Sequence, residues 1–236
     1  MWRNRTKLLV GEEGIKKLEK SSIAIIGVGG VGGYTAIMLA RAGVGKITLV
    51  DFDVVDISNI NRQVVANVET VGKLKTEVMK DMIMKINPSC EVNAISTRFS
   101  AETKGQIFTQ KFDYVIDAID SVQDKVDLID YCKKNNIQIV SAMGAGNRIA
   151  VPLFEVVDIY KTKNDGLAKV MRKKLRERQV QNLDVVCCKF PAMKIIDKES
   201  QDEDQIIQKK TVGSVSYYPA MCGCVLSAFV IENLLG

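Results

Sequence analysis

The chain has 236 residues, of which 47% are hydrophobic and 26% are charged, and its net charge is +5. These proportions are typical of a soluble globular protein and exclude a largely disordered or low-complexity chain, and the length suits one α/β domain. The absence of histidine excludes Ser-His-Asp triads, Cys-His dyads and histidine metal sites, so lysine, arginine, carboxylates, cysteine and backbone amides remain for any chemistry.

The N-terminal segment, MWRNRTKLLVGEEG, has no apolar stretch followed by a small-residue cleavage site. Secretory signal peptides have both features. We therefore expect a cytoplasmic protein.

Short apolar, β-branched runs alternate with helical patterns through the first two thirds of the chain. Strands separated by helices predict a parallel sheet joined by right-handed crossovers. We predict an α/β fold with a doubly wound, mostly parallel sheet of Rossmann type. The predicted strands are residues 23–27, 46–51, 91–96, 114–120 and 137–144.

A glycine-rich turn follows the first predicted strand. Gly27, Gly29 and Gly32 satisfy the pattern G-x-G-x-x-G, with Gly30 between them, and Asp51 ends the next strand. Glycines let phosphate approach the backbone, the following helix N-terminus attracts negative charge, and an acid about 20 residues further on can bind ribose hydroxyls. The turn alone favours NAD over ATP, and a packing turn without ligand is the third interpretation.

Polar residues after Asp51 shift this preference toward ATP. Asn59, Arg62 and Gln63 follow within twelve residues, and Lys75 comes thirteen residues after Arg62. Backbone amides suffice for a pyrophosphate cofactor, whereas a triphosphate that is broken needs fixed cations along its chain. Taken singly, Arg62 or Lys75 is more often a solvated surface charge, and it is their joint occurrence that favours a triphosphate site.

Asp120 ends the strand predicted at 114–120. It is expected at the carboxyl edge of the sheet, where open α/β folds bind ligands and where a carboxylate can hold Mg²⁺. The alternative is a cap for the following helix.

The strand–helix alternation weakens after residue 150. Residues 161–178 hold eight lysines and arginines against two acids, with Leu167, Met171 and Leu175 spaced four residues apart. This spacing predicts a basic amphipathic helix. Its charged face is either solvated or a contact for a phosphate backbone.

The remaining sequence predicts a loop over residues 181–212 and an apolar helix within 213–236. The apolar run at 220–231 is shorter than the ~20 residues that cross a bilayer, so we expect a core or interface helix without stable membrane insertion. We predict a single domain over 1–236. It comprises a nucleotide-binding part (1–150) and an antiparallel and helical part (151–236) that carries the basic helix, a crossover loop and the substrate and dimer contacts.

Five motifs occur in the order and spacing of a known family. They are GVGGVGG, DFDVVDISNINRQ, VGKLKTEVM, INP and DAIDS. With them the chain resembles the ubiquitin-activating-enzyme-like (ThiF, MoeB and HesA) superfamily, whose members adenylate a carboxylate with ATP. Within it, RTKLLVGEEG, VIDAIDSV and GSVSYYPAMCG are most similar to the tRNA threonylcarbamoyladenosine dehydratases.

The resemblance implies roles for individual residues. Asp51 would bind the ATP ribose, Asp120 would help to place Mg²⁺, and the implied catalytic residues are Arg62, Lys75, Asp120 and Arg5. The implied ATP-binding residues are Gly27, Gly29, Gly30, Gly32, Asp51, Asp53, Asn59, Arg62, Gln63 and Lys75.

The resemblance also implies partners and a reaction. Arg5 would reach the ATP of the partner subunit, which makes a homodimer necessary for function. The reaction would be ATP-dependent cyclisation of threonylcarbamoyladenosine, beside the tRNA anticodon, to an oxazolone. The basic helix would then attract the tRNA backbone, and docking of a sulfur-relay protein is left open.

Three alternatives remain at this stage. The chain could adenylate the C-terminal glycine of a ubiquitin-like sulfur carrier, although it lacks the C-x-x-C zinc pairs often seen in such activators. It could be an NAD-dependent oxidoreductase or a non-catalytic tRNA-binding module. Cys187 and Cys188 lie where related enzymes place a carrier cysteine, but buried strand cysteines are the preferred interpretation.

Overall fold

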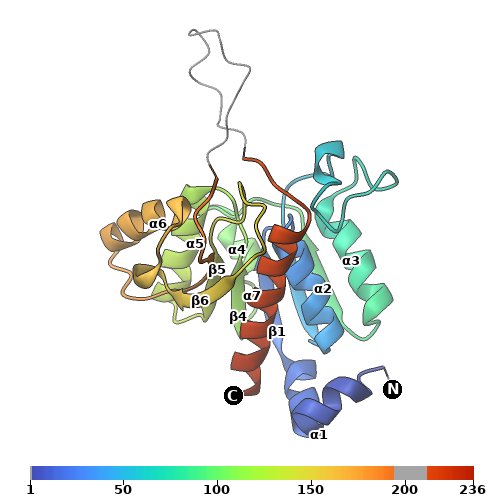
Figure 1. The fold of residues 1–236 in the computed structure, drawn as a ribbon. Coiled ribbons are helices and arrows are strands. Elements are labelled where there is room, and N and C mark those ends of the chain that lie inside the picture. Colours follow the sequence, from blue (N-terminus) through green and yellow to red (C-terminus); the bar gives the residue numbers. More distant parts are fainter. Residues whose placement is uncertain (1, 194–211) are drawn as a thin grey trace.

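The computed structural model describes residues 2–193 and 212–236. Within these ranges seven strands form one sheet in the order β3-β2-β1-β4-β5-β7-β6 (Figure 1). Only β6 and β7 pair antiparallel, so the prediction of a doubly wound, mostly parallel sheet is confirmed. The strands are β1 (Ser22–Ile26), β2 (Lys46–Val50), β3 (Glu91–Ile95), β4 (Tyr114–Asp117), β5 (Ile139–Ala142), β6 (Phe154–Asp158) and β7 (Asp184–Cys188).

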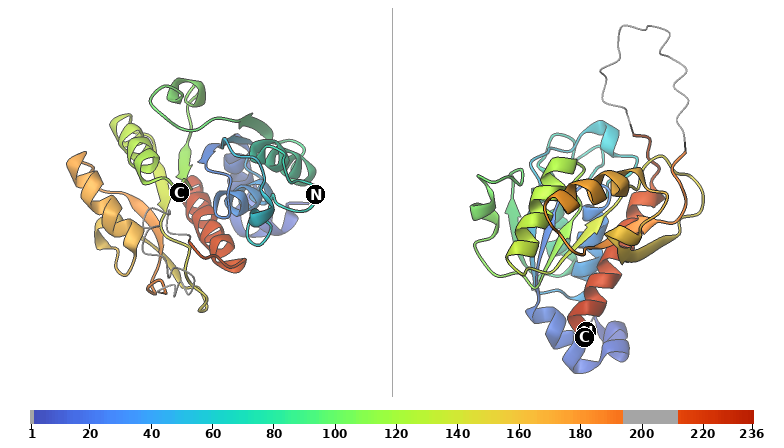
Figure 2. Two further views of the ribbon diagram at one scale, coloured as in Figure 1. Left: turned by 90° about the horizontal axis from the view of Figure 1, so that it is seen from above. Right: turned by 90° about the vertical axis from the view of Figure 1, so that its left-hand side faces the viewer.

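Helices cover both faces of the sheet (Figure 2). α2, α3 and α7 pack on one face, and α5 and α6 pack on the other. The helices are α1 (Asn4–Lys20), α2 (Gly32–Ala42), α3 (Lys75–Ile86), α4 (Lys104–Ile107), α5 (Val122–Lys134), α6 (Gly166–Glu177) and α7 (Tyr217–Leu235), with short 3₁₀ turns η1 (Ile57–Asn59) and η2 (Ile159–Lys161).

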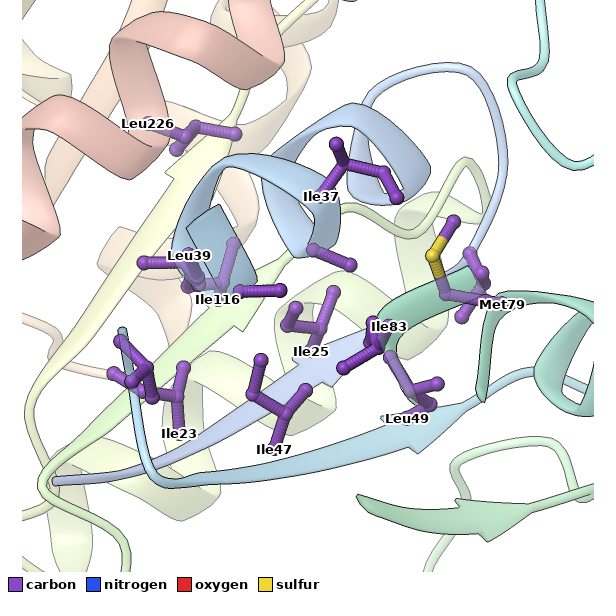
Figure 3. Close-up of a cluster of buried hydrophobic side chains, with 14 of the residues drawn as sticks. Ile23, Ile25, Ile37, Leu39, Ile47, Leu49, Met79, Ile83, Ile116 and Leu226 are labelled. Carbon is purple, nitrogen blue, oxygen red and sulfur yellow. The ribbon is translucent and has the colours of Figure 1, made fainter. Parts of the chain in front are cut away.

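The larger part of the core lies between the sheet and the helices α2, α3 and α7. Branched side chains from the central strands interlock with side chains from these three helices, as Figure 3 shows. Burial of this apolar surface holds the central strands rigid, so the loops at their carboxyl ends have a fixed base. The labelled side chains are Ile23, Ile25, Ile37, Leu39, Ile47, Leu49, Met79, Ile83, Ile116 and Leu226.

α7 packs closely against α2 because of one glycine. A Cβ atom on Gly223 would lie 2.6 Å from the carbonyl oxygen of Val31 and 3.0 Å from the backbone nitrogen of Thr35. Any larger residue would separate the two helices. By length and composition alone α7 could cross a membrane, but here it contributes Cys222, Leu226 and other side chains to the core, as expected for a core helix.

Three sequence predictions need correction. The loop predicted at 181–212 is wrong over 184–188, because DVVCC forms β7, a buried strand paired with β5 and β6; residues 194–211 of that loop lie outside the described residues. The strand predicted at 114–120 ends at Asp117. The basic helix begins at Gly166, where the Asp165 side chain accepts a hydrogen bond from the Ala168 backbone N–H, so residues 161–165 precede it.

Candidate functional site

The glycine turn joins β1 to α2 at the carboxyl edge of the sheet. Gly27 has φ +96°, and a Cβ atom there would lie 2.6 Å from the Ala118 carbonyl oxygen, so two loops meet at this point. At Gly29, by contrast, a Cβ atom would have the Gln63 Nε2 as its nearest neighbour, at 3.8 Å. Protein atoms therefore fill the space next to Gly27, whereas the space next to Gly29 is free. A phosphate-binding turn requires this combination.

Asp51 lies directly beside this turn. Its carboxylate accepts hydrogen bonds from the backbone N–H groups of Val28 (2.7 Å) and Asp53 (2.8 Å). Burial raises the pKa of Asp51, and the two N–H donors and Lys75 partly oppose that rise. Each carboxylate oxygen keeps a second lone pair, so Asp51 can both fix the turn and accept hydrogen bonds from ribose hydroxyls.

Lys75 begins α3 and is nearly buried, with 7% of its side chain exposed. Its Nζ lies 2.7 Å from the Asp53 Oδ2, and the Asp53 side chain is 47% exposed. A nearly buried ammonium group with a partly exposed carboxylate partner is a cation held in a fixed position. The same ammonium group also opposes the rise in the pKa of Asp51, so it lies within electrostatic range of that carboxylate.

The loop after β2 supplies the other predicted residues. Asn59 is buried in η1, and its Oδ1 accepts a hydrogen bond from the Asp56 N–H (3.2 Å). The Arg62 Nη1 donates to the Ser58 carbonyl oxygen and to the Asn61 Oδ1, both at 2.9 Å. The loop therefore holds the Arg62 guanidinium group through two hydrogen bonds.

Gln63 has an unsatisfied polar atom beside the open side of the turn. The residue is 7% exposed, and its buried Oε1 has no hydrogen-bond partner among the described residues. Unpaired buried polar atoms are costly and are common at binding sites. Gln63 thus has the burial and the unused bonding capacity of a ligand-contacting side chain.

The sequence predicts that Asp120 ends a strand. Instead it lies exposed in the loop between β4 and α5. The Ala118 N–H donates to the Ile26 carbonyl oxygen (2.8 Å) as the last bond of the β1–β4 ladder, and the Ala118 carbonyl lies against Gly27 of the nucleotide turn. The pKa of Arg98 is raised mainly by its ion pair with Asp124 and to a smaller extent by Asp120. Because Asp120 follows the carboxyl end of β4 by three residues, it still lies at the carboxyl edge of the sheet.

Sequence reasoning missed two buried charged residues behind this loop. Asp117 and Lys125 form an ion pair (2.9 Å) with no exposed side-chain surface. A signal was present, because Lys125 interrupts the apolar face that Val122, Val126 and Ile129 form on α5. A lysine at such a position indicates a buried charge with a specific partner.

The structure does not bring Arg5 to the carboxyl edge. α1 packs at the amino end of the sheet, where the Arg3 side chain lies against Gly43 and the Glu19 backbone against Gly45, and Figure 1 shows α1 at the opposite end of the molecule from the loops of the site. Arg5 is exposed there. The structure therefore does not place Arg5 in the site of its own chain.

Cys187 and Cys188 lie in β7 and are 1% and 0% exposed. Burial raises the pKa of Cys187 to about 11. A buried thiol with a raised pKa is a poor nucleophile, so the structure supports the interpretation of these residues as core cysteines.

The basic residues of α6 and Arg178, which directly follows this helix, differ in their surroundings. Arg178 pairs with Asp127 (2.8 Å) and Asp130 (3.2 Å), whereas Lys169 and Lys173 are exposed. Met171 and Leu175 are buried as predicted, and Leu167 is half-buried. The predicted positive face is therefore smaller than the count of basic residues indicates.

Comparison with known proteins identifies the family. The model of the ThiF family matches residues 3–236. The chain belongs to the ThiF family. The match confirms the superfamily that the five sequence motifs indicate.

Several proteins that carry the same enzyme name are similar to this chain over nearly its whole length. A Bacillus subtilis (strain 168) relative named tRNA threonylcarbamoyladenosine dehydratase is 40% identical over 238 residues, which cover 98% of this chain and 94% of the relative. The crystal structure of Escherichia coli tRNA N6-threonylcarbamoyladenosine dehydratase with AMP has a TM-score of 0.87 and 34% identity, and covers 99% of this chain and 95% of that one. The structure of the same enzyme with ATP gives a TM-score of 0.84 and 33% identity over the same shares.

Proposed function

We propose that this ThiF-family protein uses ATP to cyclise threonylcarbamoyladenosine in tRNA to its oxazolone form. The observation that carries the proposal is the end-to-end similarity to enzymes named for this dehydration. The geometry agrees with it, because an open glycine turn, a ribose-competent carboxylate and two fixed cations lie at one edge of the sheet. Adenylation of a sulfur carrier, the alternative from the sequence, has no comparable whole-chain support.

The chemistry requires a carboxylate to become an electrophile. The threonyl carboxylate attacks the α-phosphorus of ATP and pyrophosphate leaves, which gives an acyl adenylate. The ureido oxygen of the same substituent then attacks the acyl carbon and AMP leaves. A ureido nitrogen releases its proton to solvent, and the ring closes with a net loss of one water. Because the second attack is intramolecular, it has a high effective concentration and needs no nucleophile from the protein, which suits a chain without histidine.

Different residues of the site contribute to nucleotide binding and to charge neutralisation. Asp51 binds the ribose and keeps the turn in place, while the amides near Gly29 and Gly30 receive phosphate oxygens. Arg62 and Lys75 neutralise the negative charge that builds up on the phosphates during pyrophosphate release, and Asn59 and Gln63 complete the polar wall. Fixed cations of this kind stabilise a charged transition state without reorganisation.

The donor set at the carboxyl edge fits Mg²⁺. Within the described residues no group of three acidic, cysteine or histidine side chains could enclose a metal, and Mg²⁺ is typically bound by one or two carboxylates together with substrate phosphates. Asp120, an exposed carboxylate beside the nucleotide turn, would hold it. Bound there, the ion would supply further neutralisation of phosphate charge.

We propose a homodimer in which Arg5 of each subunit contacts the ATP of the other. Support comes from the position of Arg5 away from its own site and from its neighbours Leu8 and Leu9, which are 86% and 88% exposed. Neighbouring exposed leucines are a common mark of a protein contact. We place the enzyme in the cytoplasm with its tRNA substrate and leave a sulfur-relay partner unassigned.

The test of the function is mass analysis of nucleosides from tRNA incubated with the protein and ATP. We expect threonylcarbamoyladenosine to lose one water, and we expect Asp120→Ala to reduce the rate about 100-fold, because one transition-state charge partner is lost. Asp127→Ala, which removes a partly exposed carboxylate elsewhere on α5, is the control and should keep the parent rate. An unchanged nucleoside in the presence of ATP would remove the basis for the assignment.

Exposed lysines of α6 should dominate electrostatic attraction of tRNA. We expect Lys169→Ala combined with Lys173→Ala to weaken tRNA binding and to reduce the slope of log K against log salt by about 1 to 2, since each phosphate contact contributes roughly 0.7–0.9. Arg178→Ala is the matched control. Because Arg178 already pairs with two aspartates, its removal should change the slope by less than either lysine, as measured by filter binding at several salt concentrations.

A further inference from the structure

A buried polar network lies directly behind the loop that carries Asp120. The Lys125 Nζ donates to the Asp117 Oδ2 (2.9 Å) and to the Ile119 carbonyl oxygen (3.1 Å). The Ser141 Oγ donates to the same Asp117 oxygen (2.6 Å), and the Asp117 Oδ1 accepts from the Ile119 N–H (3.1 Å). The network thus joins β4, α5 and β5.

The burial of this network carries a cost in desolvation free energy. Asp117, Lys125 and Ser141 are all 0% exposed. Removal of two charges from water is costly, and a buried ion pair often stabilises a fold no better than apolar side chains of similar size. Such a pair is therefore weak evidence for stability and points to a requirement for a specific local geometry.

The geometry that the network fixes is that of a single residue. Both backbone polar groups of Ile119 are held, its N–H by Asp117 and its carbonyl oxygen by Lys125. Ile119 directly precedes Asp120, and its neighbour Ala118 contacts the nucleotide turn at Gly27. The exposed carboxylate of Asp120 therefore projects from a backbone that is fixed on the side of the turn and on the side of α5.

We propose that Asp117 and Lys125, supported by Ser141, are positioning residues that hold the Asp120 carboxylate against the nucleotide turn in the place where it meets Mg²⁺ and the phosphates. The inference rests on the proposed function of Asp120. It assigns to the buried pair a role in metal-dependent nucleotide binding as well as in the fold. A freely moving loop would place the carboxylate correctly only part of the time, which lowers apparent affinity by that fraction.

The test compares ATP binding with and without MgCl₂ by titration calorimetry, in the absence of tRNA. Lys125→Met alone would leave a buried, unpaired carboxylate, so the main variant combines Asp117→Asn with Lys125→Met and removes both charges. We expect ATP affinity without Mg²⁺ to stay within about 2-fold of the parent, and the Mg²⁺-dependent gain in affinity to fall at least about 5-fold. Ser141→Ala, which removes one donor and no charge, should change the gain in the same direction by a smaller factor.

Val126→Ala is the control for general loss of stability, because Val126 is buried on the same helix beside Lys125 and takes no part in the network. It should lower the melting temperature and leave the Mg²⁺-dependent gain unchanged. An unchanged gain in both network variants, while Asp120→Asn abolishes it, would overturn the positioning role. If Asp120→Asn itself leaves the gain unchanged, the proposed role of Asp120 fails and the inference fails with it.

Discussion

Lys75→Met is expected to lower the rate of ATP-dependent dehydration about 100- to 1,000-fold, because a fixed cation that stabilises a developing negative charge contributes a factor of this order. Lys75 is 7% exposed and its Nζ is already held by Asp53 at 2.7 Å. The enzyme therefore does not need to order this side chain when ATP binds. Methionine retains the length and the apolar contacts of lysine, so the substitution removes mainly the charge.

The measurement for Lys75→Met is initial rate at saturating ATP and tRNA, together with the melting temperature. Lys46→Met is the matched control, since Lys46 also pairs with a carboxylate, Glu91 at 2.9 Å, but lies at the amino end of β2. The control should keep the parent rate. A Lys75 variant that is folded and turns over at the parent rate would show that the cation near Asp53 does not act on the phosphates.

The nucleotide-binding residues at the carboxyl edge of the sheet are predictable from the sequence because the motifs that identify them are local. The glycine turn, Asp51 and the loop to Arg62 lie within 36 residues, and each depends on the backbone geometry of one strand–turn–helix unit. A parallel sheet then brings such units to the same edge without further information. For this reason the sequence alone indicates that the turn and Asp51 lie together.

The edge strands and the buried ion pair depend instead on distant partners. β6 follows β5 without an intervening α-helix and pairs antiparallel with β7, so this edge of the sheet lacks the regular strand–helix alternation that identifies the central strands. Lys125 has no carboxylate at helical spacing that marks it as paired; its partner Asp117 is eight residues away on β4. Only the packing of α5 on the sheet brings the two charges together.

Neither a local sequence motif nor the packing of one chain determines where Arg5 acts. The residue lies in an N-terminal helix whose apolar side chains Leu8 and Leu9 contact little of their own chain. Its function in this proposal depends on a second subunit. The N-terminal helix therefore requires an experiment that distinguishes the contribution of one chain from that of its partner.

Arg5→Ala is expected to lower the dehydration rate about 100-fold in the homodimer, because a guanidinium group directed at the phosphates of the other subunit is lost. Arg41→Ala is the matched control, since Arg41 is also exposed and lies at the C-terminal end of α2, at the same end of the molecule as α1. That control should retain the parent rate. The single substitution alone, however, does not show whether Arg5 acts on its own site or on that of the partner.

Mixed dimers resolve the two cases. In a dimer of one Arg5→Ala chain and one Lys75→Met chain, the first chain keeps an intact Lys75 and receives Arg5 from the second, while the other site lacks both residues. If Arg5 acts across the interface, the purified mixed dimer has one complete site and about half of the parent activity, although both variant homodimers are nearly inactive. If Arg5 acts within its own chain, each site of the mixed dimer lacks one cation, and the activity stays at the level of the homodimers.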